Sequence, residues 1–150
     1  MEQTYVMIKP GFANRRWVVD EVIKRITETE GLKIVDIGRV RYGRKEARIH
    51  NIEHRNKVFF DDLVGYFMSD FVVGMIVEGD DAIRKVRSLI GHYKSPEKGT
   101  IRYDIQSALG LGFDCRKNVV HASDSKESAK VEIGIFQSLC EGESLIENQA

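Results

Sequence analysis

The chain has 150 residues, of which 42% are hydrophobic and 31% are charged, as is usual for one soluble globular domain. Its 23 basic and 23 acidic residues cancel, which excludes a strongly basic nucleic-acid-binding or membrane-surface protein. Two cysteines, Cys115 and Cys140, are too few for a disulfide framework, and no segment has the pattern of a signal peptide or a membrane span. We therefore expect a soluble, cytoplasmic protein without a membrane partner.

The first half of the chain alternates strand and helix patterns. Residues 4–8 have the composition of a strand, and the apolar residues of 18–26 recur at helical spacing. Residues 32–40 mix β-branched and polar side chains, as a half-buried strand does. Residues 44–66 are more polar and indicate one or two short helices.

The second half begins with a nearly unbroken apolar run at 71–77, which predicts a central strand. A helix is expected at 83–90, followed by a long segment rich in glycine and lysine. A short strand at 118–120 and a helix at about 125–140 end a single domain of residues 1–140. The polar residues 141–150 carry no periodic pattern and are predicted to form a C-terminal tail, either mobile or used as an assembly contact.

Without the short helices, the order of elements is β-α-β-β-α-β. This order indicates an α+β protein with a ferredoxin-like antiparallel four-stranded sheet, and we expect its helices to pack on one face.

A histidine lies in the most informative segment, residues 118–125, which read Asn-Val-Val-His-Ala-Ser-Asp-Ser. His121 is expected where the last strand ends, and Ser125 is expected to be the N-cap of the following helix. Helix N-termini attract phosphate, and a neutral imidazole is a competent nucleophile near pH 7. The other histidines, His50, His54 and His92, lack such a context and are predicted to be surface residues.

This segment, together with the following Glu-Ser-Ala at 127–129, resembles the active-histidine signature of nucleoside diphosphate kinases. Met-Ile-Lys-Pro at 7–10, the paired phenylalanines and Leu-Val of 59–64, and Gly-Thr-Ile-Arg at 99–102 match the same family in order. The resemblance implies a kinase that moves the terminal phosphoryl group of a nucleoside triphosphate to a nucleoside diphosphate by a ping-pong mechanism through a phosphohistidine at His121. It also implies the ferredoxin-like fold and a homo-oligomer, either a hexamer or a tetramer.

Two further catalytic residues are implied. A nucleophilic histidine needs an acceptor on its second ring nitrogen, and the resemblance selects Glu132 for this role. Glu132 shares one helical stripe with Ala129 and Phe136, so its carboxylate is expected to face inward. Ser123 would hydrogen-bond the carboxylate or the transferred phosphoryl group, although serines near a helix start are commonly caps.

The nucleotide-binding residues implied by the resemblance come from five separate segments. Phosphate contacts are expected from cations, because phosphoryl transfer is largely the stabilisation of charge. An apolar pair spaced four residues apart would grip the base, and Asn118 would contact the sugar. The set is Lys9, Phe59, Leu63, Arg87, Tyr93, Arg102 and Asn118, with Tyr93 in place of the family's usual threonine. Magnesium is implied as a cofactor that arrives with the nucleotide, and no metal ligand is predicted among the side chains.

The chain departs from the family pattern in three further places. Residues 9–12 read Lys-Pro-Gly-Phe where Lys-Pro-Asp-Gly is usual, Asn51 replaces a tyrosine, and the segment 103–117 is longer than usual. These departures, with Tyr93, leave open a catalytically weak, nucleotide-binding interaction module of the same fold. A third hypothesis is a ferredoxin-like regulatory domain that binds a small effector, in which His121 is structural. The joint presence of His121, Glu132, Lys9 and Arg102 favours the active kinase.

Overall fold

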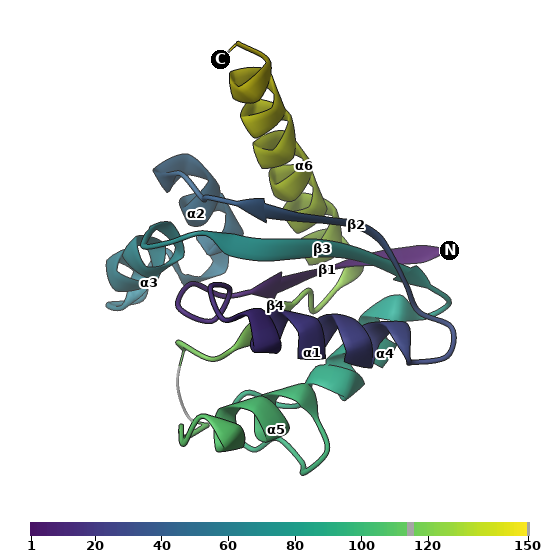
Figure 1. Ribbon diagram of the computed structural model, residues 1–150. Coiled ribbons are helices and arrows are strands. Elements are labelled where there is room, and N and C mark those ends of the chain that lie inside the picture. Colours follow the sequence, from purple (N-terminus) through teal and green to yellow (C-terminus); the bar gives the residue numbers. More distant parts are fainter. Residues whose placement is uncertain (114–115, 150) are drawn as a thin grey trace.

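The computed structural model describes residues 1–113 and 116–149, with side chains described as far as Gly142. In chain order the helices and strands are β1 (Glu2–Ile8), α1 (Arg16–Thr27), β2 (Lys33–Val40), α2 (Arg44–His50), the 3₁₀ helix η1 (Ile52–His54), α3 (Phe60–Met68), β3 (Val72–Gly79), α4 (Ala82–Ile90), α5 (Ile101–Ala108), β4 (Val120–Ala122) and α6 (Lys126–Gln149) (Figure 1).

The four strands form one antiparallel sheet in the order β2-β3-β1-β4. This is the predicted α+β, ferredoxin-like arrangement, with α2, η1, α3, α5 and α6 added to the basic βαββαβ motif. The strand predicted at 71–77 is β3, and it lies between β2 and β1 as expected of a central strand.

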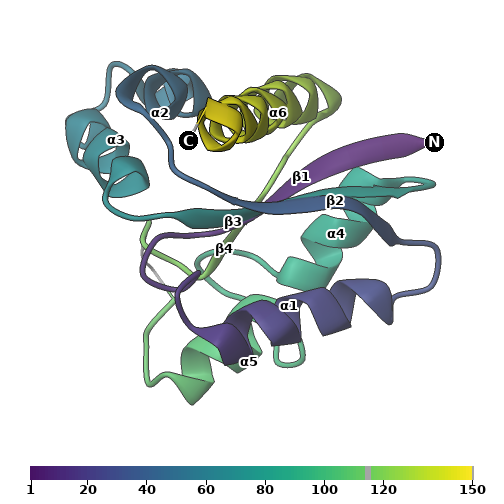
Figure 2. The same cartoon turned by 45° about the horizontal axis from the view of Figure 1, so that its top comes forward.

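The two helices of the basic motif, α1 and α4, pack on one face of the sheet, as predicted, and the added helices α2, α3 and α6 cover the other face. Figure 2 shows α2, α3 and α6 on one side and α1, α4 and α5 on the other. Each side has its own apolar cluster, with Val22 and Val86 in one and Phe67 and Phe136 in the other. The central strands β1 and β3 are buried over most of their length, because a strand covered on both faces carries a continuous apolar run.

The last strand begins later than predicted. β4 spans Val120–Ala122, and His121 lies in its middle, opposite Met7 of β1, instead of at the end of a strand. The backbone stays extended through His121 because β4 continues its pairing with β1 as far as Ala122. The predicted helix cap is confirmed, since the backbone N–H of Ser128 donates to Ser125 Oγ at 3.1 Å.

Helix α5, within and just before the longer segment 103–117, was not predicted. Thr100 caps it by accepting from the backbone N–H of Tyr103, and Ile101 and Ile105 bury its inner face. Asp104 joins α5 to α1 through an ion pair with Arg25 at 2.7 Å.

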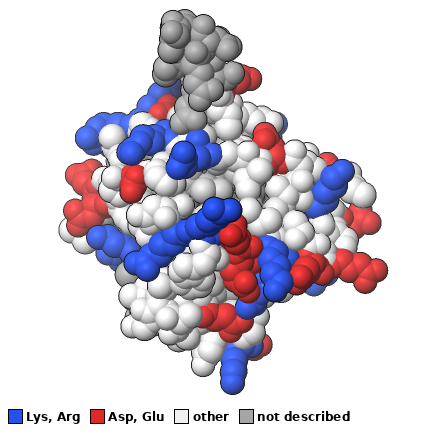
Figure 3. All heavy atoms as spheres, in the orientation of Figure 1, with Lys and Arg blue, Asp and Glu red and all other residues white. Residues whose placement is uncertain are grey.

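Helix α6 continues to Gln149, beyond the predicted end near residue 140. The division into a domain of 1–140 and a tail of 141–150 stays a prediction. Among the described residues, none of the helices combines the length and apolarity needed to cross a bilayer. Basic and acidic side chains are interspersed over the face shown in Figure 3, consistent with the balanced composition.

Candidate active site

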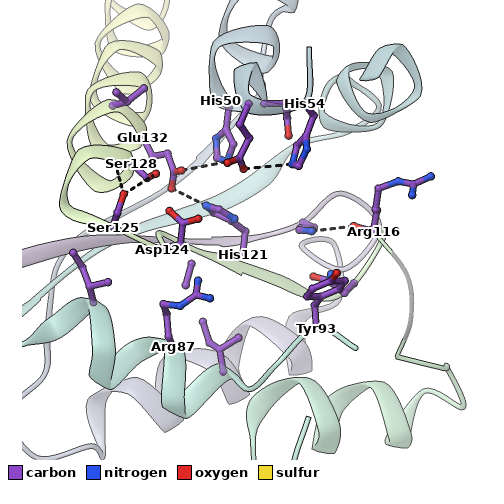
Figure 4. Close-up of a pocket in the computed structure, with 18 of the residues that line it drawn as sticks. His50, His54, Arg87, Tyr93, Arg116, His121, Asp124, Ser125, Ser128 and Glu132 are labelled. Atoms are coloured by element: carbon purple, nitrogen blue, oxygen red, sulfur yellow. Dashed lines mark hydrogen bonds and ion pairs between the residues drawn. The ribbon is translucent and has the colours of Figure 1, made fainter. Parts of the chain in front are cut away.

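His121 and Glu132 form the centre of the site. β4 carries His121 and α6 carries Glu132, and the short connection between these elements brings the two side chains together. The His121 Nε2–H donates to Glu132 Oε1 at 2.7 Å, and Glu132 is only 6% exposed (Figure 4). This contact fixes the ring of His121 and leaves its other nitrogen, Nδ1, as the one available for reaction.

Ser123 supports the same carboxylate. Its hydroxyl donates to Glu132 Oε1 at 2.8 Å and accepts from the backbone N–H of Tyr5 at 3.2 Å. The backbone N–H of Ser123 in turn donates to the carbonyl of Tyr5. Because Ser123 is fully buried, its hydroxyl does not face a ligand. It holds the carboxylate of Glu132 in position.

His50 lies beside this pair, contrary to the prediction that it is a surface residue. Its side chain is 3% exposed, its ring centroid lies 4.7 Å from that of His121, and its Nε2 lies 4.0 Å from Glu132 Oε2. Its Nδ1 is hydrogen-bonded to the hydroxyl of Tyr42 at 3.0 Å, and that hydroxyl is 3.0 Å from the hydroxyl of Tyr5. No periodic pattern of apolar residues indicated this burial, because α2 is short and mostly polar.

Burial controls the ionisation of the cluster. Burial first, and then the charges of Lys9 and Arg102, lower the pKa of His121 to about 3. Burial and the neighbouring His121 lower the pKa of His50 to about 3, whereas burial raises the pKa of Glu132. Both imidazoles are therefore neutral near pH 7, and a neutral imidazole keeps the lone pair that a nucleophile needs.

His121 opens into a cleft of about 1300 Å³. Nine of the ten site residues predicted from the sequence line this one cleft, and the buried Ser123 is the exception; the nine are Lys9, Phe59, Leu63, Arg87, Tyr93, Arg102, Asn118, His121 and Glu132. These residues come from elements far apart in the chain, and the fold brings their side chains to a single cleft.

Three cations surround the histidine. Lys9, at the end of β1, is 7% exposed and donates to the carbonyl of Arg116 at 3.0 Å. Arg102 of α5 is largely buried and donates to the carbonyls of Gly91 and Val120, and burial lowers its pKa to about 10. Arg87 of α4 is exposed at the mouth of the cleft. Such an arrangement attracts a polyanion such as a phosphate chain.

Apolar and polar groups line the remainder of the cleft. Phe59, just before α3, and Leu63 of α3 lie four residues apart, and both line the cleft. Asn118 is 4% exposed. Tyr93 is 42% exposed and stacks on His92 with ring centroids 5.0 Å apart.

Two other groups in the cleft were not predicted to belong to the site. The guanidinium of Arg116 lies 4.1 Å from the ring centroid of Phe59. Asn51 is buried and donates from Nδ2 to the carbonyl of Ala47 at 2.8 Å, so its side-chain amide satisfies a carbonyl group near the C-terminal end of α2. The site as a whole combines a neutral imidazole, a carboxylate hydrogen-bonded to that imidazole, and cations around it. This combination is suited to accept a phosphoryl group.

The chain also matches known proteins over most of its length. The family model described as nucleoside diphosphate kinase matches residues 2–141. The nucleoside diphosphate kinase of Archaeoglobus fulgidus is 47% identical over 140 residues, which are 92% of this chain and 87% of the relative. The chain belongs to the nucleoside diphosphate kinase family.

Other nucleoside diphosphate kinases support the assignment. One from Listeria monocytogenes is 44% identical over 138 residues, 91% of this chain and 88% of the relative. The solved structure of the Halobacterium salinarum enzyme in complex with CDP has a TM-score of 0.77 at 37% identity, covering 90% of this chain and 86% of that one. The Encephalitozoon cuniculi enzyme has a TM-score of 0.77 at 32% identity, with 90% and 88% covered. These matches support nucleoside diphosphate kinase activity, a phosphotransferase reaction.

Proposed function

We propose that this nucleoside diphosphate kinase works by a ping-pong mechanism in which His121 carries the phosphoryl group. The observation that carries the proposal is the hydrogen bond of 2.7 Å between His121 Nε2 and Glu132 Oε1, in a cleft bordered by Lys9, Arg87 and Arg102. No observation favours the alternative of a catalytically weak interaction module.

In the first half-reaction, Nδ1 of His121 attacks the terminal phosphorus of a nucleoside triphosphate. The new N–P bond forms as the bond to the bridging oxygen breaks, and the nucleoside diphosphate leaves with that electron pair. The imidazole becomes positively charged, and Glu132 stabilises this charge through the Nε2–H. A different nucleoside diphosphate then takes the phosphoryl group by the reverse reaction.

The other site residues bind the substrate. Lys9, Arg87 and Arg102 neutralise the phosphate chain, and Tyr93, which lines the same cleft, can donate a hydrogen bond from its hydroxyl. Phe59 and Leu63 grip the base by stacking and apolar contact, which does not read its hydrogen-bonding edge. Asn118 contacts the sugar. The CDP complex of the Halobacterium salinarum relative is consistent with nucleotide binding in this family.

Magnesium fits this site as an ion carried by the phosphates. The cleft places cations around His121, and Asp124 is an exposed carboxylate whose charge acts on that histidine. A hard oxygen-seeking ion would be held by the substrate phosphates, with Asp124 as the adjacent carboxylate. When bound, magnesium neutralises charge that develops on the phosphate oxygens.

We also propose a homo-oligomer, a hexamer or a tetramer, located in the cytoplasm. β2 is an edge strand of the sheet and exposes the apolar side chains of Val35 and Ile37, which are 41% and 44% exposed. Exposed apolar edges are usually covered in the native assembly. Light scattering after size-exclusion chromatography tests the proposal, and a monomer would refute it.

The mass of the intact protein tests the catalytic proposal. After brief mixing with ATP and magnesium, the mass should increase by one phosphoryl group, and the increase should disappear after excess GDP is added. The same experiment on His121→Ala should show no increase, whereas His92→Ala should still be labelled. Labelling that persists in His121→Ala would refute the assignment, and nucleotide binding without labelling of the wild type would favour the interaction module.

A further inference from the structure

His50 has one buried ring nitrogen that the proposed mechanism does not use. Its Nε2 is buried and has no hydrogen-bond partner among the described residues. Glu132 Oε2 is the acceptor on that side, but at 4.0 Å it is beyond hydrogen-bonding distance. A buried polar atom without a hydrogen-bond partner lowers the stability of the folded protein. Such an atom in a native structure therefore indicates a functional role, such as binding a ligand.

This nitrogen belongs to a cluster with the chemistry of a metal site. His50, His121 and Glu132 each offer a ligand atom, and the three atoms lie within 4.8 Å of one another. Glu132 lies between the two imidazoles. Its Oε1 is 2.7 Å from His121 Nε2, and its Oε2 is 4.0 Å from His50 Nε2. Figure 4 shows the three side chains converging from α2, β4 and α6.

We propose that His50, His121 and Glu132 form a site for a borderline divalent cation of the zinc type, which inhibits the enzyme. Two imidazoles and one carboxylate suit zinc or cobalt, whereas magnesium and calcium prefer oxygen ligands. The site is separate from the magnesium that the nucleotide carries. The inhibitory consequence, but not the binding itself, rests on the proposed function.

The distances suit such an ion after a small adjustment. Zinc lies about 2.0–2.2 Å from nitrogen and oxygen ligands, so two ligand atoms of a tetrahedral ion are ~3.3 Å apart. The gap between His50 Nε2 and Glu132 Oε2 must therefore shorten from 4.0 Å, and the contact between His121 Nε2 and Glu132 must lengthen from 2.7 Å.

The surroundings of His50 resemble the outer shell of a metal ligand. Its Nδ1 and the hydroxyls of Tyr42 and Tyr5 form a buried hydrogen-bonded chain, each step 3.0 Å long. If Nδ1–H donates to Tyr42 and Tyr42 donates to Tyr5, the lone pair of Nε2 points at the cluster. Metal-binding histidines are characteristically held in this way through their second nitrogen.

Binding of the ion would block the reaction at His121. The ion replaces the proton on His121 Nε2, which passes to solvent, and Glu132 becomes a ligand of the ion instead of an acceptor from the ring. Because the ion withdraws electron density from the imidazole, Nδ1 becomes a poorer nucleophile. Three protein ligands leave a fourth position of a tetrahedral ion, which water or a phosphate oxygen could take.

Equilibrium binding of Zn²⁺ to the full chain, without nucleotide, tests the proposal. The wild type should bind one ion, His50→Gln should bind it far more weakly, and Tyr42→Phe should lose about 10- to 100-fold in affinity, as expected for loss of an outer-shell partner. The matched control is His54→Gln, because His54 lines the same cleft and its side chain is 35% exposed. This control should bind zinc like the wild type.

Absence of zinc binding by the wild type would overturn the proposal, as would equal binding by His50→Gln or an equal loss in His54→Gln. If His50→Gln does not fold, the visible spectrum of Co²⁺ bound to the wild type decides: intense bands of tetrahedral cobalt support the site, and weak octahedral bands contradict it. If the protein binds zinc here but forms no phosphohistidine, the proposed mechanism is refuted and the zinc site is not. A protein that forms phosphohistidine but binds no zinc refutes the zinc site alone.

Discussion

His121 Nε2 and Glu132 Oε1 lie 2.7 Å apart, although the two residues belong to a strand and a helix on opposite sides of a turn. The same carboxylate oxygen also accepts from the hydroxyl of Ser123 at 2.8 Å. Glu132 is thus held by two donors and holds one ring orientation of His121. The account of phosphoryl transfer depends on this contact, because it decides which ring nitrogen reacts.

Replacement of Glu132 by glutamine should slow the phosphorylation of His121 by about 10- to 100-fold, as expected when an orienting partner is lost. Glutamine keeps the size of the side chain but loses the charge that stabilises the imidazolium. Single-turnover measurements with ATP and magnesium provide the rate, and nucleotide affinity should stay unchanged. The control is Glu141→Gln, an exposed position on the same helix. An unchanged rate in Glu132→Gln would assign the orienting role to another group.

The rate of phosphorylation should be nearly independent of pH between pH 8 and about pH 5. An ordinary histidine has a pKa of about 6.5 and would lose its nucleophilic form within this range. Burial, Lys9 and Arg102 lower the pKa of His121 to about 3, so its neutral form persists. Single-turnover rates at saturating ATP and magnesium test this, and a tenfold decrease per pH unit below 6.5 would disprove it.

Stability should decrease as the pH falls below 6.5, partly because of His50. Its pKa is lowered to about 3 in the folded protein, so between these values the unfolded chain binds a proton that the folded chain does not. Each pH unit in this range costs about 1.4 kcal/mol per such group. The raised pKa of Glu132 acts in the opposite direction, since its stabilising contribution is present at low pH and lost as the pH rises.

Urea unfolding of the wild type and His50→Gln at pH 7, 6 and 5 measures this contribution directly. The wild type should lose stability faster than the variant, by about 1.4 kcal/mol per pH unit below 6.5. Parallel pH dependences would mean that His50 titrates normally in the folded protein.

Much of the fold follows from local patterns in the sequence. The apolar run of 71–77 predicted the central strand β3, and the stripe containing Ala129, Glu132 and Phe136 correctly predicted that Glu132 is buried. The packing of α2, α3 and α6 on the second face of the sheet was not predicted, although the same unbroken run carries that information. α5 was missed because a single capping threonine, Thr100, and two buried isoleucines were obscured by the glycines around them.

The candidate site could be predicted only in part. The residues with a family match, such as Lys9 and Arg102, do line one cleft with His121. His50 and Tyr42 could not be found in this way, because their roles arise from a tertiary contact between α2, β1 and α6 and leave no periodic signal. A lone histidine in a polar segment looks like a surface residue until the fold places another helix over it.

Replacement of Gly74 by alanine should destabilise the protein by about 1–3 kcal/mol through overpacking. Gly74 lies in β3 beneath α6, and a Cβ there would lie 2.6 Å from Phe136 and 3.0 Å from the hydroxyl of Tyr5. The control is Gly65→Ala in α3, where a Cβ would meet nothing within 4 Å. That change should stabilise the protein by about 0.5–1 kcal/mol. Thermal or urea unfolding compares the variants, and equal effects would contradict the packing described for α6.

The most direct test of the central claim is to identify the phosphorylated atom. Protein labelled with ¹⁵N in its histidines is phosphorylated with ATP and magnesium, and the ring nitrogens of His121 are followed by ¹H–¹⁵N correlation NMR. The account predicts phosphorus on Nδ1, with Nε2 still protonated and hydrogen-bonded to Glu132. Phosphorus on Nε2, or on any residue other than His121, would contradict it.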